Sequence, residues 1–122
     1  MLGLRTVIYR VDDLDRAKDW YREAFEVEPY FDQPFYVGFQ VDGFELGLDP
    51  DLSESRPGPG GTVAYWGVDD VAAAFDRLVK LGASAITPAK DVGGGITVAT
   101  VADPFGNLIG LIFNPHFGKA AP

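Results

Sequence analysis

Residues 6–21 read TVIYRVDDLDRAKDWY, and residues 62–78 read TVAYWGVDDVAAAFDRL. The two stretches align on Val-Asp-Asp, which places Val11 and Val68 in equivalent positions 57 residues apart. Each begins with β-branched and aromatic residues that favour a strand and continues with apolar residues at helical spacing. A strand followed by a helix therefore occurs twice in this chain.

The C-terminal parts of the two copies also correspond. LGLDP at 46–50 matches the start of IGLIFNP at 109–115, so that Gly47 and Gly110 are equivalent with an offset of 63 residues. The second copy therefore carries about six more residues in its middle than the first. A shared beginning and a shared end indicate a duplicated supersecondary unit.

Each copy has the predicted order strand, helix, strand, strand, strand. In the first copy we expect the helix to end near Phe25, and the predicted strands are 4–11, 28–31, 35–41 and 44–48. In the second copy Gly82 ends the helix, and the strands after it are 84–87, 96–102 and 108–113. The Asp-Asp pairs at 12–13 and 69–70 are predicted to cap the two helices.

The predicted fold class is therefore α+β, with two βαβββ units. We expect one domain over 1–122, divided into a first unit at 3–50, a linker at 51–61, a second unit at 62–115 and a tail at 116–122. Each helix covers only one face of its sheet. Two such sheets side by side are expected to pair around a concave cavity suited to a small molecule.

Three stretches carry a resemblance to a known family: VIYRVDDLDRAKDWYREAF, WGVDDVAAAFDRLVKLGA and ADPFGNLIGLIFNP. Together they resemble the vicinal oxygen chelate superfamily of glyoxalases, extradiol dioxygenases and bleomycin-resistance proteins. The DPxGNxIxL pattern in the third stretch is the most specific. The resemblance covers residues 3–115, and Glu26 departs from it because the family often has glycine after the first helix.

Metal-dependent members of that family hold a divalent ion with four His or Glu side chains, one from the first and one from the last strand of each unit. The resemblance carries these positions to Thr6, Gly47, Val63 and Gly110, none of which binds a metal well. The single histidine, His116, is either a tail residue or a base. Glu45 lies on the same face as Gly47 and is a weak candidate to replace a lost ligand. We therefore expect no metal and no cofactor.

Strand alternation predicts which side chains face the cavity. Gly47 and Gly110 are expected to leave space there, and Arg10 either clamps an anionic ligand group or pairs with an acidic neighbour. For residues 35–40 either the odd-numbered or the even-numbered side chains face inward. The candidate ligand-binding residues are Thr6, Ile8, Arg10, Glu45, Gly47, Asp49, Val63, Tyr65, Leu108, Gly110 and Ile112.

The amino-acid composition indicates which classes of binding partner and which cellular location to expect. The net charge of −8 disfavours nucleic acid and anionic membranes, and it either only keeps the protein soluble or attracts cationic ligands. The chain has no cysteine, which excludes disulfides and thiolate chemistry and is consistent with a cytoplasmic protein. It has no run of roughly 18–20 apolar residues and no signal-peptide pattern.

Three functions remain open. The first is metal-independent binding of a small cationic or aromatic molecule, such as an antibiotic or toxin that is sequestered, with the homodimer that the resemblance to bleomycin-resistance proteins implies. The second is a glyoxalase-like or dioxygenase-like lyase or isomerase whose metal site is lost or replaced, with Glu45, Asp49 or Tyr65 transferring protons. The third is an accessory domain without a ligand.

Overall fold

The computed structural model describes residues 4–60 and 63–116. The chain divides into two compact units. Unit 1 takes in the chain up to Gly58 together with Phe105–Asn107, and unit 2 takes in the rest.

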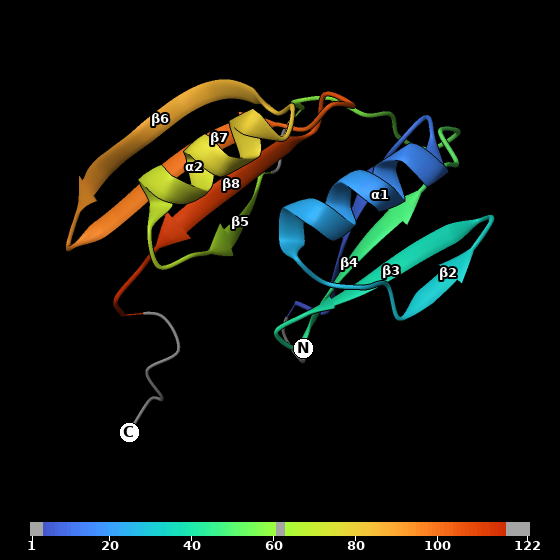
Figure 1. Ribbon diagram of the computed structural model, residues 1–122, viewed down its shortest axis with the longest axis horizontal. Helices are drawn as coiled ribbons and strands as arrows, with labels where there is room; N and C mark the ends of the chain where they lie inside the picture. The colour runs from blue at the N-terminus through green and yellow to red at the C-terminus, as the bar shows by residue number, and fades with distance from the viewer. Residues whose placement is uncertain (1–3, 61–62, 117–122) are drawn as a thin grey trace. The chain divides into compact units, whose positions relative to one another are not determined.

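Unit 1 contains one helix and a four-stranded mixed sheet (Figure 1). The strand order is β1-β4-β3-β2, with β1 parallel to β4 and the other neighbours antiparallel. Its elements are β1 (Thr6–Arg10), α1 (Leu14–Phe25), β2 (Phe31–Gln33), β3 (Tyr36–Val41) and β4 (Phe44–Asp49).

Unit 2 repeats this arrangement. The strand order is β5-β8-β7-β6, and β5 is parallel to β8 as β1 is to β4. Its elements are β5 (Ala64–Gly67), α2 (Val71–Lys80), β6 (Ser84–Gly93), β7 (Ile96–Ala102) and β8 (Leu108–Phe113). The predicted α+β class with two βαβββ units is confirmed.

Most of the predicted elements appear with bounds within two residues of those expected, and two strands differ by more. The predictions for 96–102 and 108–113 match β7 and β8. The strand expected at 28–31 lies instead at Phe31–Gln33, and the strand expected at 84–87 continues to Gly93. Gly94 and Gly95 form the turn between β6 and β7, and they and Gly93, the last residue of β6, have positive φ.

Both helices begin directly after the Asp-Asp pairs, as the sequence predicted. The Asp13 carboxylate accepts a hydrogen bond from the Arg16 backbone N–H at 3.1 Å, and the Asp70 carboxylate accepts one from the Ala73 N–H at 3.0 Å. Each satisfies a backbone donor that has no partner inside its helix. The second aspartate of each pair is therefore the cap.

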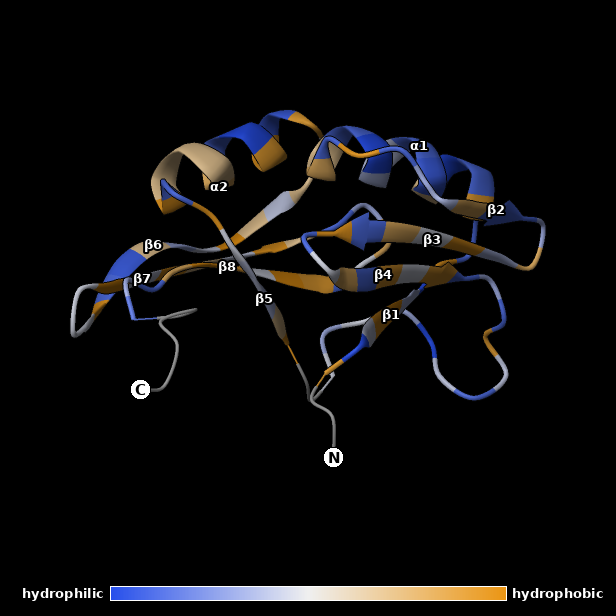
Figure 2. Cartoon of the chain, turned by 90° about the horizontal axis from the view of Figure 1, so that it is seen from below, coloured by the Kyte–Doolittle hydropathy of each residue, from blue (hydrophilic) through white to orange (hydrophobic). Residues whose placement is uncertain are grey.

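The core of each unit lies between the helix and one face of its sheet. In unit 1 the Tyr21 ring on α1 is fully buried and stacks on Tyr9 and Phe25, with ring centroids 5.6 and 5.7 Å away. Figure 2 shows hydrophilic residues along the side of α1 that faces away from its sheet. The opposite face of each sheet carries no helix of its own unit, and we call it the open face.

The turn before β8 contributes to unit 1. The Asn107 side chain donates to the Arg10 carbonyl at 2.8 Å and accepts from the Gly58 N–H at 3.1 Å. Asn107 is buried, with 6% of its surface exposed, so these bonds replace water at both of its polar atoms.

Within 4–60 and 63–116, no helix is both long and apolar enough to cross a lipid bilayer.

Candidate functional site

Strand alternation assigns the open face of unit 1. Val37, Phe39, Leu46 and Leu48 are buried against α1, so their neighbours along β3 and β4 face the other way. This resolves the alternative that the sequence left open, because the even-numbered side chains of β3 lie on the open face. That face carries Thr6, Ile8 and Arg10 of β1, Tyr36, Gly38 and Gln40 of β3, and Glu45, Gly47 and Asp49 of β4.

Glu45 lies at the centre of a hydrogen-bonded cluster on this face. Its Oε1 atom accepts from the Thr6 hydroxyl at 3.1 Å and from the Tyr36 hydroxyl at 2.9 Å. Its Oε2 atom accepts from the Tyr30 hydroxyl. Three elements and the segment before β2 therefore meet at one carboxylate, and we call Thr6, Tyr30, Tyr36 and Glu45 the Glu45 cluster.

The hydrogen bonds of the Glu45 cluster shift the pKa values of its carboxylate and its two phenols. The hydrogen bond from Tyr30, together with those from Tyr36 and Thr6, lowers the pKa of Glu45 against the opposing effect of burial. Burial and the bond to Glu45 raise the pKa of Tyr36, and the bond to Glu45 raises that of Tyr30. The carboxylate therefore stays ionised and the phenols stay neutral at physiological pH.

The space expected beside Gly47 is filled. A Cβ atom at Gly47 would overlap the Tyr36 hydroxyl and would lie 2.6 Å from Tyr36 Cζ. In unit 2 a Cβ atom at Gly110 would lie 2.7 Å from Tyr65 Cγ. The prediction that these glycines leave empty space was wrong, because a tyrosine ring on a neighbouring strand covers each of them.

Arg10 is engaged within its own unit. Its Nη1 atom lies 3.1 Å from Asp49 Oδ2 and donates to the Asp51 carbonyl at 3.0 Å. The Arg10 and Asp49 side chains are only 19% and 22% exposed. Of the two roles considered for Arg10, the structure contains the ion pair.

The residues predicted for unit 2 lie on or next to β5 and β8. Tyr65 is 49% exposed and lies opposite Gly110 in the parallel pair, and Val63 precedes β5. Leu108 and Ile112 alternate with the buried Ile109 and Leu111, which places them on the open face.

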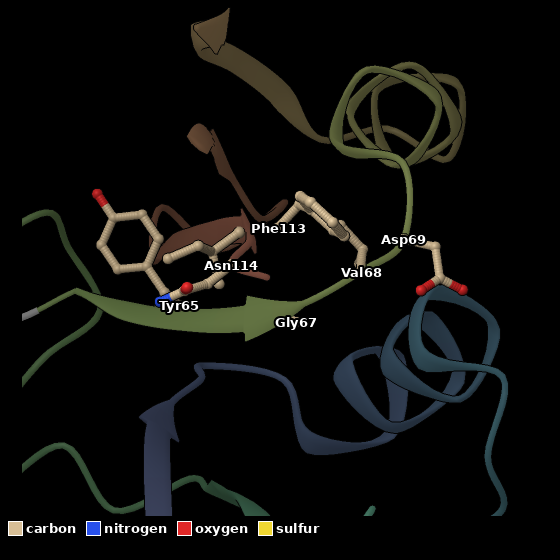
Figure 3. Close-up of a pocket in the computed structure, with 7 residues that line it drawn as sticks. Tyr65, Gly67, Val68, Asp69, Phe113 and Asn114 are labelled. Carbon is tan, nitrogen blue, oxygen red and sulfur yellow. The ribbon is translucent and has the colours of Figure 1, made fainter. Parts of the chain in front are cut away.

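A pocket of about 470 Å³ opens at the ends of β5 and β8 in unit 2. Figure 3 shows Tyr65 and Asp69 at opposite ends of the row of side chains around it. The lining residues are Tyr65, Gly67, Val68, Asp69, Phe113 and Asn114, with Ile112 on β8 completing the wall. Alternation predicted Tyr65 and Ile112, but it could not find the residues that follow the strand ends.

The positions that hold metal in other members of the resembled family do not fit an ion here. In unit 1 the Thr6 hydroxyl donates to Glu45, and Tyr36 occupies the space that a side chain at Gly47 would need. In unit 2 neither Val63 nor Gly110 offers a side-chain donor. Across 4–60 and 63–116, no three His, Cys, Asp or Glu side chains lie close enough to hold a metal ion.

His116 holds the last described residues against unit 2. Its Nε2 atom lies 2.9 Å from the Gly94 carbonyl oxygen, and its backbone N–H donates to Asn114 Oδ1 at 2.9 Å. The ring therefore contacts the β6–β7 turn, which sequence reasoning did not anticipate. The rest of the predicted tail, 117–122, lies outside the described residues.

Comparison with known proteins places these observations in a family. Residues 3–111 match the Glyoxalase/Bleomycin resistance protein/Dioxygenase superfamily. The chain is 30% identical over 112 residues to the uncharacterized protein Mb0911c of Mycobacterium bovis, and the match covers 80% of this chain and 74% of that one. It shares the same identity with the uncharacterized protein Rv0887c of Mycobacterium tuberculosis, of whose length the match covers 66%.

Solved structures of members of this superfamily share the fold of the chain. A glyoxalase-related enzyme from Fulvimarina pelagi superposes with a TM-score of 0.78 at 26% identity, covering 94% of this chain and 90% of that one. A superfamily member from Sphaerobacter thermophilus gives a TM-score of 0.76 at 19% identity, covering 93% and 98%. The chain therefore belongs to the glyoxalase/bleomycin resistance protein/dioxygenase superfamily, the family also called vicinal oxygen chelate.

Proposed function

We propose that this protein binds a small organic molecule without a metal ion and sequesters it, as bleomycin-resistance-like members of the superfamily do. The observation that carries the proposal is the pair of tyrosine-covered glycines. Tyr36 over Gly47 and Tyr65 over Gly110 put aromatic rings where metal-dependent relatives need ligand side chains.

The chemistry of the open faces supports an aromatic or cationic ligand. The Tyr65 ring is about half exposed on its sheet and can stack on a planar group. Glu45 stays ionised, and the chain carries a net charge of −8, so the surface attracts cations and repels anions.

The protonation of Glu45 favours binding over proton transfer. A general base works best when its pKa lies near the working pH, which for a carboxylate requires a raised value. The hydroxyls of Tyr30, Tyr36 and Thr6 shift the pKa of Glu45 in the opposite direction. Asp49 is held by Arg10. Glu45 and Asp49, two of the three residues considered for proton transfer, are therefore held in hydrogen bonds and an ion pair that stabilise unit 1.

A ligand screen tests the proposal. We expect at least one class among glycopeptide antibiotics, aromatic amines, aromatic acids and thiol conjugates to raise the melting temperature of the purified protein. Tyr65→Ala should weaken that effect, because it removes the exposed ring. Ile86→Ala, which removes a 52% exposed side chain from β6, is the matched control and should not. A stoichiometric transition metal in the purified protein, or no shift with any class, would contradict the proposal.

A further inference from the structure

The internal duplication allows the two units to be compared at the ends of their parallel strands. The sequence offsets make Arg10 equivalent to Gly67 and Asp49 equivalent to Ile112. The strand registers agree, because Arg10 lies opposite Asp49 and Gly67 opposite Ile112. Even the backbone bond that follows is repeated, at 3.1 Å from Val11 N–H to the Asp49 carbonyl and 2.9 Å from Val68 N–H to the Ile112 carbonyl.

In unit 1 this location is filled by the chain itself. The Arg10 guanidinium pairs with Asp49 and donates to the Asp51 carbonyl, and both side chains of the pair are mostly buried. A cationic group on an alkyl stem thus occupies the end of the β1–β4 pair.

In unit 2 the equivalent location is open. Gly67 has no side chain, and a Cβ atom built on it would have no heavy atom within 4 Å. Ile112 replaces the carboxylate that holds Arg10 in unit 1. The result is the pocket of about 470 Å³, a volume within the range of small-molecule sites.

The lining of this pocket selects for a ligand type. Tyr65 supplies aromatic surface on the open face and is 49% exposed. Phe113 alternates with Ile112 and so lies toward the other face at the end of β8, where it adds a second partly exposed ring to the lining. Asp69 supplies a carboxylate that the helix does not use, because Asp70 is the cap. None of the residues that line the pocket is basic, so a ligand anion would find no partner among them.

We propose that the pocket beside Gly67, which we call the Gly67 pocket, binds an aromatic ring that carries a protonated amine on a short chain, with the ring against Tyr65 and the ammonium toward Asp69. The inference rests on the proposed function and names the ligand class and the place of binding. An aromatic face and a carboxylate are the two groups that recognise such a cation.

Three compounds that share one ring separate the contributions of shape and charge: tryptamine, tryptophol and indole-3-propionate. We expect affinity to fall in that order, with tryptamine about two- to five-fold tighter than the neutral alcohol, as for an exposed ion pair. Two-dimensional amide NMR measures the affinity and also locates the ligand. The largest shifts should fall on Gly67, Val68 and residues 112–114.

Two variants test the place and the charge. Gly67→Arg recreates the side chain of unit 1 and should weaken tryptamine by about ten-fold or more, because it fills the pocket and repels the ammonium. Ser84→Arg adds the same charge to exposed β6, at the other edge of the sheet, and should leave affinity within about two-fold. Asp69→Asn should abolish the preference for tryptamine over tryptophol while tryptophol binds as before.

The outcomes separate this inference from the proposed function. Amide shifts outside the pocket, unchanged affinity in Gly67→Arg, or a preference for tryptamine that survives Asp69→Asn would overturn the inference. The inference would also be overturned if compounds of other classes bound and the three indole compounds did not. The proposed function would stand in that case. If no compound of any class binds, both fail. If Gly67→Arg does not fold, Asp69→Asn and the shift pattern still decide.

Discussion

At the scale of single residues, the charge of Glu45 depends on three hydroxyl groups from separate parts of unit 1. Strand alternation predicted that Glu45 and Thr6 share a face. It did not assign Tyr30 to this face, because the strand that the sequence predicted at 28–31 begins only at Phe31, and it left the orientation of Tyr36 open. The lowered pKa of Glu45 is therefore a property of side-chain packing that the local pattern does not encode.

Glu45→Gln should change the dependence of stability on pH. Because the pKa of Glu45 is lower in the folded than in the unfolded chain, the ionised carboxylate stabilises the fold above its ordinary pKa of 4.5. This contribution is lost as the pH falls below that value through the folded-state pKa. Urea unfolding should show a larger difference between wild type and variant at pH 7 than at pH 3.

Glu54→Gln removes one exposed carboxylate outside the cluster and is the control for the change in net charge. If the stability difference from wild type changes between pH 7 and pH 3 by the same amount for Glu45→Gln as for Glu54→Gln, the cluster does not hold Glu45 ionised.

Gly47→Ala should destabilise unit 1. The added methyl group would overlap the Tyr36 hydroxyl and would force the ring off Gly47 and away from Glu45. Overpacking of this kind costs about 1–3 kcal/mol of unfolding free energy. Gly67→Ala is the matched control, because nothing lies within 4 Å of its new methyl group, and it should change stability by less than about 0.5 kcal/mol. Equal effects of the two substitutions in chemical unfolding would refute the close packing of Tyr36.

At the scale of elements, the predictions succeeded where the sequence pattern was strong and failed at the sheet edges. The predicted bounds of β7 and β8 match because their alternation is regular and their inner residues are buried. β2 has three residues, all exposed, so no apolar pattern marks it. β6 extends past Pro88, which is tolerated because β6 is an edge strand with irregular register.

The end of α1 offers a test at this scale. Glu26 adopts the left-handed conformation with φ 55° and ψ 43°, at the position where the family often has glycine. A side chain there costs backbone energy that glycine avoids, so Glu26→Gly should stabilise the protein by about 0.5–1 kcal/mol.

Glu26→Ala removes the same carboxylate but keeps a Cβ atom, so it isolates the backbone effect. We expect it to be less stable than Glu26→Gly in thermal unfolding. Equal stability of the two variants would show that the left-handed conformation carries no cost at this helix end.

At the scale of the whole molecule, duplication and the DPFGN pattern were enough to predict the family and the βαβββ units, both now confirmed. The Gly67 pocket was not predicted, because it arises from the absence of a side chain that the first unit has. The homodimer and the cytoplasmic location stay predictions, and sedimentation equilibrium would test the first of them.

The central claim is that binding needs no metal ion, because tyrosine rings cover the glycines at the ligand positions. The most direct measurement is the ligand-induced rise in melting temperature, taken before and after chelation and after divalent ions are restored. A ligand at ten times its Kd stabilises the fold by about 1.4 kcal/mol, or about 5 °C for a domain of this size. We predict the same rise in all three states. A rise that vanishes on chelation and returns with the ion would contradict the account.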